Sequence, residues 1–127
     1  MNILLMALLL ATPISTWRMK VTAYCCCSIC CEKWSGGGVT STGRDASLPG
    51  AAADPRVLPY GTVLDIPGIG VRAIDDTGGA MRKSARKQAI HIDVRMATHA
   101  EARAWGVRWL EVGVVRYERR NTNTVKG

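Results

Sequence analysis

Three aspartates stand in settings where a carboxyl group could do chemistry. Asp54 precedes a proline, Asp76 opens an Asp-Thr-Gly-Gly segment, and Asp93 lies in the apolar run Ile-Asp-Val. A carboxylate inside an apolar strand is costly to bury unless it is hydrogen-bonded or put to use. If the fold brings the three together, repulsion and partial burial will raise the pKa of at least one of them. A carboxyl group that stays protonated near neutral pH is what general acid cleavage of a glycosidic bond requires.

The elements that would position these aspartates are short strands joined by glycine turns. Alternating apolar residues and β-formers predict strands at 19–24, 62–66, 71–75, 89–94 and 110–117, with residues 57–58 extended. A Thr-x-x-Glu capping box at 98–101 predicts a helix that Gly106 closes. Residues 32–50 form a long loop, and the basic stretch 81–88 is a loop or a short helix. Short strands with one late helix describe a small β-barrel.

Composition sets the size and the charge of this barrel. The chain has 127 residues, enough for one domain with its own core. Lys and Arg number 17 against 10 Asp and Glu, a formal net charge of +7. This excess favours polyanions or anionic surfaces as partners, and no nucleic-acid-binding motif accompanies it. The basic runs at 82–87 and 116–120 are either solvated segments or a track for an anionic ligand.

The two ends of the chain differ from the middle. Residues 3–11 are an apolar run that Pro13 ends. A membrane-spanning helix needs about 20 apolar residues, so this length fits a signal-peptide core better. We therefore expect residues 1–17 to be a signal peptide or an apolar leader, residues 18–118 to be the barrel domain, and residues 119–127 to be a polar tail.

All five cysteines lie within residues 25–31. In an oxidising compartment one or two local disulfides are expected, and the odd number leaves a thiol over. Reduced thiols, or a metal bound through the Cys27-x-x-Cys30 spacing, are the alternatives. The sequence does not choose among the three states of Cys25, Cys26, Cys27, Cys30 and Cys31.

Taken in order, these residues resemble a known family. Val-Thr-Ala-Tyr-Cys at 21–25, Thr-Gly at 42–43, Ala-Asp-Pro at 53–55 and Leu-Pro-Tyr-Gly-Thr at 58–62 come first. Asp-Thr-Gly-Gly-Ala at 76–80, Ile-Asp-Val at 92–94 and Ala-Trp-Gly at 104–106 follow. The series resembles the 3D domain family, which is named for three aspartates and includes the catalytic domain of membrane-bound lytic transglycosylase A. The resemblance implies a mainly β fold, a six-stranded double-psi β-barrel with one or two short helices.

The resemblance also implies an activity and its residues. The reaction would cleave the β-1,4 bond between N-acetylmuramic acid and N-acetylglucosamine in peptidoglycan and leave a 1,6-anhydromuramyl end. Asp93 matches the family's general acid/base, and Asp76 and Asp54 would set its pKa or orient the sugar. Substrate contacts would come from Thr77, Gly78, Gly79, Thr62, Tyr24 and Trp34. No cofactor and no metal are needed.

The expected partners are peptidoglycan glycan strands and anionic wall polymers, bound by a monomer that is secreted or held in a bacterial cell envelope, of cellular or phage origin. Compared with the link typical of the family that the chain resembles, the basic stretch between Asp76 and Asp93 is longer, and we expect it to alter the rim of the groove or to contact an anionic polymer. Rival hypotheses are a non-catalytic glycan-binding barrel, a homodimeric aspartic protease built on the Asp-Thr-Gly turn, and a redox or metal module using the cysteines.

Three further polar residues have local interpretations. Asp65 and Asp75 are expected to face solvent or to make local hydrogen bonds. His91 lies two residues before Asp93, on the same face of the predicted strand. It either tunes Asp93 or is packed in the fold.

Overall fold

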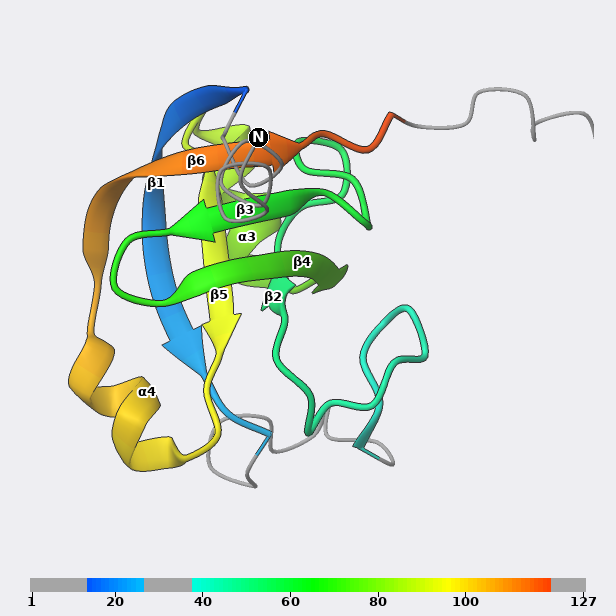
Figure 1. Ribbon diagram of the computed structural model, residues 1–127, viewed down its shortest axis with the longest axis vertical. Helices are drawn as coiled ribbons and strands as arrows, with labels where there is room; N and C mark the ends of the chain where they lie inside the picture. Colours follow the sequence, from blue (N-terminus) through cyan, green and yellow to red (C-terminus); the bar gives the residue numbers. More distant parts are fainter. Residues whose placement is uncertain (1–13, 27–37, 120–127) are drawn as a thin grey trace, which may run out of the picture.

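The computed structural model describes residues 14–26 and 38–119. Their strands are β1 (Ser15–Tyr24), β2 (Ala51–Ala52), β3 (Val63–Ile66), β4 (Gly70–Asp76), β5 (His91–Arg95) and β6 (Arg108–Arg116), and their helices are α3 (Gly79–Arg86) and α4 (His99–Trp105). The six strands close into a barrel in the order β1-β5-β2-β4-β3-β6 (Figure 1). The prediction of a mainly β, six-stranded barrel with one or two short helices is confirmed. The parallel pairs β1–β5 and β2–β4 are compatible with the double-psi arrangement.

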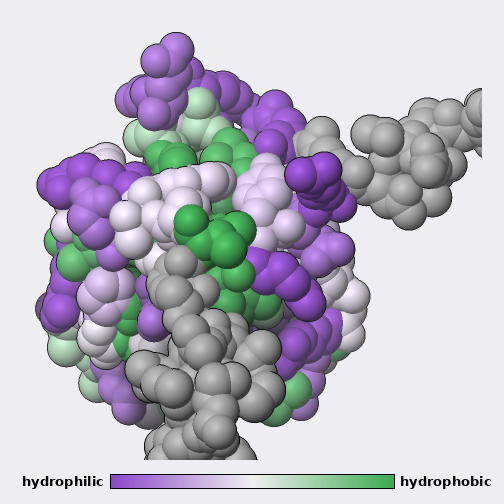
Figure 2. Space-filling view, turned by 45° about the horizontal axis from the view of Figure 1, so that its top comes forward, coloured by the Kyte–Doolittle hydropathy of each residue, from purple (hydrophilic) through white to green (hydrophobic). Residues whose placement is uncertain are grey.

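Alternation along the strands fills the barrel with apolar side chains. Met19 and Val21 of β1, and Ile92 and Val94 of β5, are each 0% exposed. The rest of this cluster is Ala51, Ala53, Leu58, Leu64, Ile66, Ile74, Val112 and Val114. On the face shown in Figure 2, hydrophilic side chains cover much of the surface around a smaller hydrophobic area. Since neighbouring residues of a strand point to opposite faces, the polar residues between these core positions must face outward.

The predicted hairpin at 62–75 is present as β3 and β4, which pair antiparallel with Asp65 opposite Val71. A turn with Gly68 at a φ of 81° joins them, a conformation that glycine adopts without strain. The expectation for residues 57–58 is wrong, because they lie in a turn whose amides both donate to the carbonyl of Asp54. The extended segment nearby is β2, which the sequence did not indicate.

Both helices follow directly from a strand. The hydroxyl of Thr98 accepts a hydrogen bond from the amide of Glu101 at 3.1 Å, and Gly106 ends α4 with a φ of 68°, so the predicted capped helix is confirmed. The basic stretch at 81–88, for which the sequence allowed a loop or a short helix, lies largely in the helix α3. The indole of Trp105 donates to the carbonyl of Val21 at 3.1 Å and fixes α4 against β1. No helix in residues 14–26 and 38–119 is both long and apolar enough to cross a membrane.

Strand β1 begins earlier than its alternation predicts. Ser15 pairs with Val114, and Trp17 pairs with Val112, so residues 15–17 of the proposed leader form part of the barrel sheet. The apolar run at 3–11, the candidate stacking residue Trp34, and three of the cysteines (Cys27, Cys30, Cys31) lie outside the described residues. Of the other two cysteines, Cys25 is buried and Cys26 is exposed.

Candidate functional site

The site is built on the outward face of the parallel pair β1–β5. In this register Lys20 lies beside His91, Thr22 beside Asp93, and Tyr24 beside Arg95. Because the residues between them point into the core, all six side chains start from one face. Successive pairs are about 7 Å apart along the strands. We call this row of three pairs the polar strip.

Asp93 occupies the middle of the polar strip and is partly buried. The hydroxyl of Thr22 donates to its Oδ1 at 3.0 Å. Burial raises the pKa of Asp93 to about 6; the Thr22 hydrogen bond opposes the rise and the charge of Asp76 adds to it. A carboxyl group with this pKa is protonated in about half of the molecules at pH 6 and in about a tenth at pH 7, far more than an ordinary aspartate, as a general acid requires.

Asp76, at the end of β4, is held in the opposite state. Its Oδ1 accepts from the amide and hydroxyl of Ser41 at 3.0 and 2.6 Å and from the amide of Thr77 at 2.9 Å. The phenol of Tyr24 donates to its Oδ2 at 2.9 Å. Burial raises the pKa of Asp76, but these hydrogen bonds outweigh it and hold the pKa below its ordinary value. The site therefore pairs one carboxylate whose pKa is lowered with one whose pKa is raised.

A buried ion pair holds the phenol of Tyr24 in position. Arg95 binds Asp75 through two hydrogen bonds of 3.0 and 2.7 Å, and it donates a third to the phenol oxygen of Tyr24 at 3.0 Å. Arg95 and Asp75 are only 4% and 5% exposed. The interpretation of Asp75 as solvent-facing or locally bonded is thus wrong, because its partner lies 20 residues away on another strand. A β-carbon at Gly50 would overlap both side chains of this pair, so the glycine leaves room for it.

Sequence reasoning missed Thr22, Ser41 and Arg95 as parts of the site. Thr22 and Arg95 alternate in register with Tyr24 and Asp93, two residues away on the same strands, and this period of two is the signal that could have found them. Ser41 lies in a loop distant in sequence from Asp76, and nothing local to it indicates the contact.

His91 hydrogen-bonds the same threonine that holds Asp93. Its Nε2 lies 2.7 Å from the hydroxyl of Thr22, and its Nδ1 lies 3.1 Å from the hydroxyl of Ser84 on α3. Burial, followed by the charge of Lys20, lowers the pKa of His91. A neutral imidazole can accept at one nitrogen and donate at the other, so it fixes the orientation of the Thr22 hydroxyl.

Asp54 is engaged elsewhere. Its carboxylate accepts from the amide of Arg56 at 2.9 Å and from that guanidinium at 2.8 Å, and this hydrogen bonding lowers the pKa of Asp54. Within the described residues, no hydrogen bond joins it to Asp76 or Asp93. The structure thus couples two of the three predicted aspartates electrostatically, and a catalytic role for Asp54 stays a prediction.

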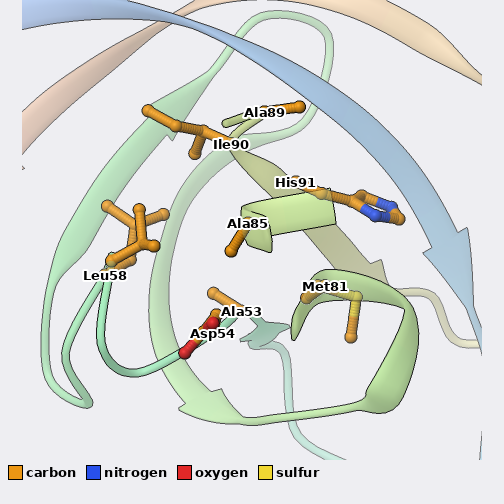
Figure 3. A pocket seen from close by; sticks show the side chains of 9 residues that line it. Ala53, Asp54, Leu58, Met81, Ala85, Ala89, Ile90 and His91 are labelled. Carbon is orange, nitrogen blue, oxygen red and sulfur yellow. The ribbon is translucent and has the colours of Figure 1, made fainter. Parts of the chain in front are cut away.

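Figure 3 shows what separates Asp54 from the polar strip. Asp54 and His91 lie on opposite sides of a small apolar space, with Met81 and Ala85 of α3 between them. The ring of His91 points away from Asp54. The geometry favours Asp54 as the residue that shapes the turn after β2.

Only some of the predicted substrate contacts lie near the polar strip. Tyr24 is in the polar strip, and Gly79 is exposed where α3 begins, next to Asp76 and Thr77 in sequence. A side chain at Gly78 would meet the end of Met81, whereas Gly79 has open space around it. Thr62 is 0% exposed and accepts a hydrogen bond from the amide of Glu118 at 3.2 Å, so it has no surface to offer a ligand.

No set of three or more His, Cys, Asp or Glu side chains in residues 14–26 and 38–119 is arranged to hold a metal ion. The polar strip combines a carboxyl group of raised pKa, a nearby carboxylate of lowered pKa, and a phenol tied to both that carboxylate and an arginine.

Two comparisons with known proteins found similar sequences. The cell wall-binding protein YocH of Bacillus subtilis (strain 168) is 37% identical to the chain over 82 residues, which are 61% of this chain and 26% of that protein. The chain thus spans about a quarter of that relative's length. The family model of the 3D domain matches residues 50–116, a segment that includes Asp54, Asp76 and Asp93. The chain therefore belongs to the 3D domain family.

Proposed function

We propose that this protein is a peptidoglycan lytic transglycosylase in which Asp93 is the general acid and base. The observation that carries the proposal is the pKa of about 6 at Asp93, on an outward face of the barrel and next to an ionised Asp76. The 3D domain match and the name of the relative YocH support a role at the bacterial cell wall. That role requires a secreted or envelope location.

The reaction uses the two protonation states of Asp93 in turn. The protonated carboxyl donates its proton to the glycosidic oxygen as the bond from C1 of N-acetylmuramic acid breaks and positive charge develops on the sugar. The resulting carboxylate takes the proton of the muramic acid C6 hydroxyl as that oxygen bonds to C1. The 1,6-anhydro ring forms, the N-acetylglucosamine keeps its hydroxyl, and Asp93 regains its proton without any water being added.

Asp76 and Thr22 are assigned supporting roles in this scheme. The negative charge of Asp76 opposes loss of the proton from Asp93, and it favours a developing positive charge nearby. The hydroxyl of Thr22 fixes one oxygen of Asp93, so the other oxygen is left to face the sugar.

The test is digestion of purified peptidoglycan with product identification by mass spectrometry. Wild type should release anhydromuropeptides, and Asp93→Ala should release none. Because the acid must be protonated, the rate should fall as the pH rises through about 6. Products with reducing ends would instead mean hydrolysis by water.

The second candidate is a barrel that binds wall glycan without cutting it. The name of YocH, a cell wall-binding protein, favours this alternative. Co-sedimentation of the wild type with insoluble peptidoglycan that stays intact would establish it. We do not retain the aspartic protease hypothesis, because residues 76–79 lie inside the segment that matches the 3D domain.

A further inference from the structure

A groove of about 360 Å³ lies at one end of the polar strip. Its walls come from β1, β6, α3 and the start of β5. The residues that give it chemical character are Lys20, Lys83, Lys87, Ser84, His91 and Trp109. Among the described residues that line it there is no aspartate or glutamate.

The three lysines converge on this groove from two directions. Lys83 lies in α3, and Lys87, four residues later, caps the C-terminal end of this helix; both line the groove. Lys20 reaches the groove from β1, where it pairs with Trp109 of β6. Trp109 is 49% exposed and adds an apolar surface beside the three ammonium groups. Three cations with no acid among them make a site for an anionic group.

The groove adjoins the proposed reaction centre. His91 lines the groove and hydrogen-bonds Thr22, which in turn holds Asp93. The Lys20–His91 pair is two residues along the strands from the Thr22–Asp93 pair, a distance of about 7 Å. An anionic substituent on a sugar held at Asp93 would therefore lie close to the lysines.

We propose that this groove binds a carboxylate of the peptide that N-acetylmuramic acid carries. The proposal rests on the proposed function, which places that sugar at Asp93. A lysine ammonium accepts a carboxylate or a phosphate, so charge alone does not choose between them. The position of the groove does, because the peptide is attached to the very sugar whose bond is cut. The three lysines would therefore make the protein prefer glycan whose peptides keep a free carboxylate.

The test measures binding rather than cleavage, so that it is independent of the activity. Full-length Asp93→Asn is titrated calorimetrically with soluble peptidoglycan fragments that carry peptides and with the same fragments after their peptide carboxylates have been converted to neutral amides. The fragments with free carboxylates should bind roughly 3- to 10-fold more tightly at low salt, as expected for a few exposed ion pairs. The preference should shrink as salt is added.

Two double variants in the same background locate the preference. K83Q/K87Q should remove most of it, whereas R82Q/R86Q, which removes the same charge from α3 outside the groove, should keep it. Equal affinity for both fragments, no measurable binding of either, or a preference that survives K83Q/K87Q would overturn the proposal. So would tighter, lysine-dependent binding of a glycerol phosphate polymer, which would assign the groove to phosphate. Release of anhydromuropeptides by the wild type is scored separately and tests the proposed function alone.

Discussion

Replacing Asp93 with asparagine should stabilise the protein more at high pH than at low pH. Burial raises the pKa of Asp93 from 3.8 to about 6, so between these values the folded state holds a proton that the unfolded chain has lost. The free energy of unfolding of the wild type therefore falls as the pH rises through this window and is lowest above pH 6. Asparagine cannot ionise, and it still accepts the hydrogen bond from Thr22.

The size of the effect follows from the pKa. One pH unit corresponds to about 1.4 kcal/mol, so full ionisation of Asp93 costs at most about 3 kcal/mol. Because this carboxyl is only partly buried and solvent screens it, we expect about 1–2 kcal/mol. The measurement is urea unfolding of wild type and Asp93→Asn at pH 4 and pH 8, with the difference in free energy of unfolding compared between the two.

A control with the opposite sign uses the neighbouring carboxylate. Hydrogen bonds hold the pKa of Asp76 below its ordinary value, so its stabilising contribution is present at pH 8 and is lost as the pH falls through that lowered pKa. Asp76→Asn should therefore destabilise the protein at pH 8 by about 1–3 kcal/mol, and less in acid. If Asp93→Asn gave the same change at pH 4 and pH 8, the raised pKa would not exist and the general acid assignment would lose its physical basis.

The remaining predictions concern the groups around the two carboxylates. Thr22→Val removes the hydroxyl that favours ionised Asp93, so the pH at which transglycosylase activity is half lost should rise by roughly one unit. Thr22→Ser keeps a hydroxyl and should leave this pH unchanged. An unchanged pH midpoint in Thr22→Val would contradict the assignment. Gly50→Ala should force apart the buried Arg95–Asp75 pair and cost about 2 kcal/mol or more in urea unfolding. A Gly50→Ala protein as stable as wild type would mean that the pair contributes little.

Elements with local signals could be predicted from the sequence. Alternating β-branched residues around a Pro-Gly turn predict the hairpin of β3 and β4, and the capping threonine and closing glycine predict α4. Strand β2 has no such signal, because its two alanines have no β preference and are held between β4 and β5 by tertiary pairing alone. The six-stranded double-psi barrel was expected from the resemblance to a family, and the order of its strands was not predicted, since it depends on pairings between strands far apart in the chain.

Site residues could be predicted where the neighbouring sequence shows their chemistry. They were missed where their contacts depend on how distant strands pair. Asp93 stands out as a charge in an apolar run, and its raised pKa follows from that setting. Asp75 and Asp76 are adjacent and look alike in the sequence, yet they have different partners. The register of β2 against β4 shifts so that Ala51 faces Ile74 and Ala52 faces Asp76, which leaves Asp75 as the extra residue of a bulge. Bulges redirect side chains, and this one turns Asp75 toward Arg95.

This bulge explains why two consecutive aspartates can serve one site. Asp75 neutralises Arg95 in the interior, where an unpaired charge would be costly. Arg95 also donates a hydrogen bond to the phenol oxygen of Tyr24. Because that oxygen accepts from Arg95, the phenol proton is free to be donated to Asp76. Asp76 stays ionised and its charge acts on Asp93. Burial is the main cause of the raised pKa of the proposed catalytic acid, and the smaller part that comes from Asp76 depends on a chain of contacts that starts at a buried ion pair. Loss of Arg95 or Asp75 should therefore change the pKa of Asp93 through Tyr24 and Asp76, although neither residue touches Asp93.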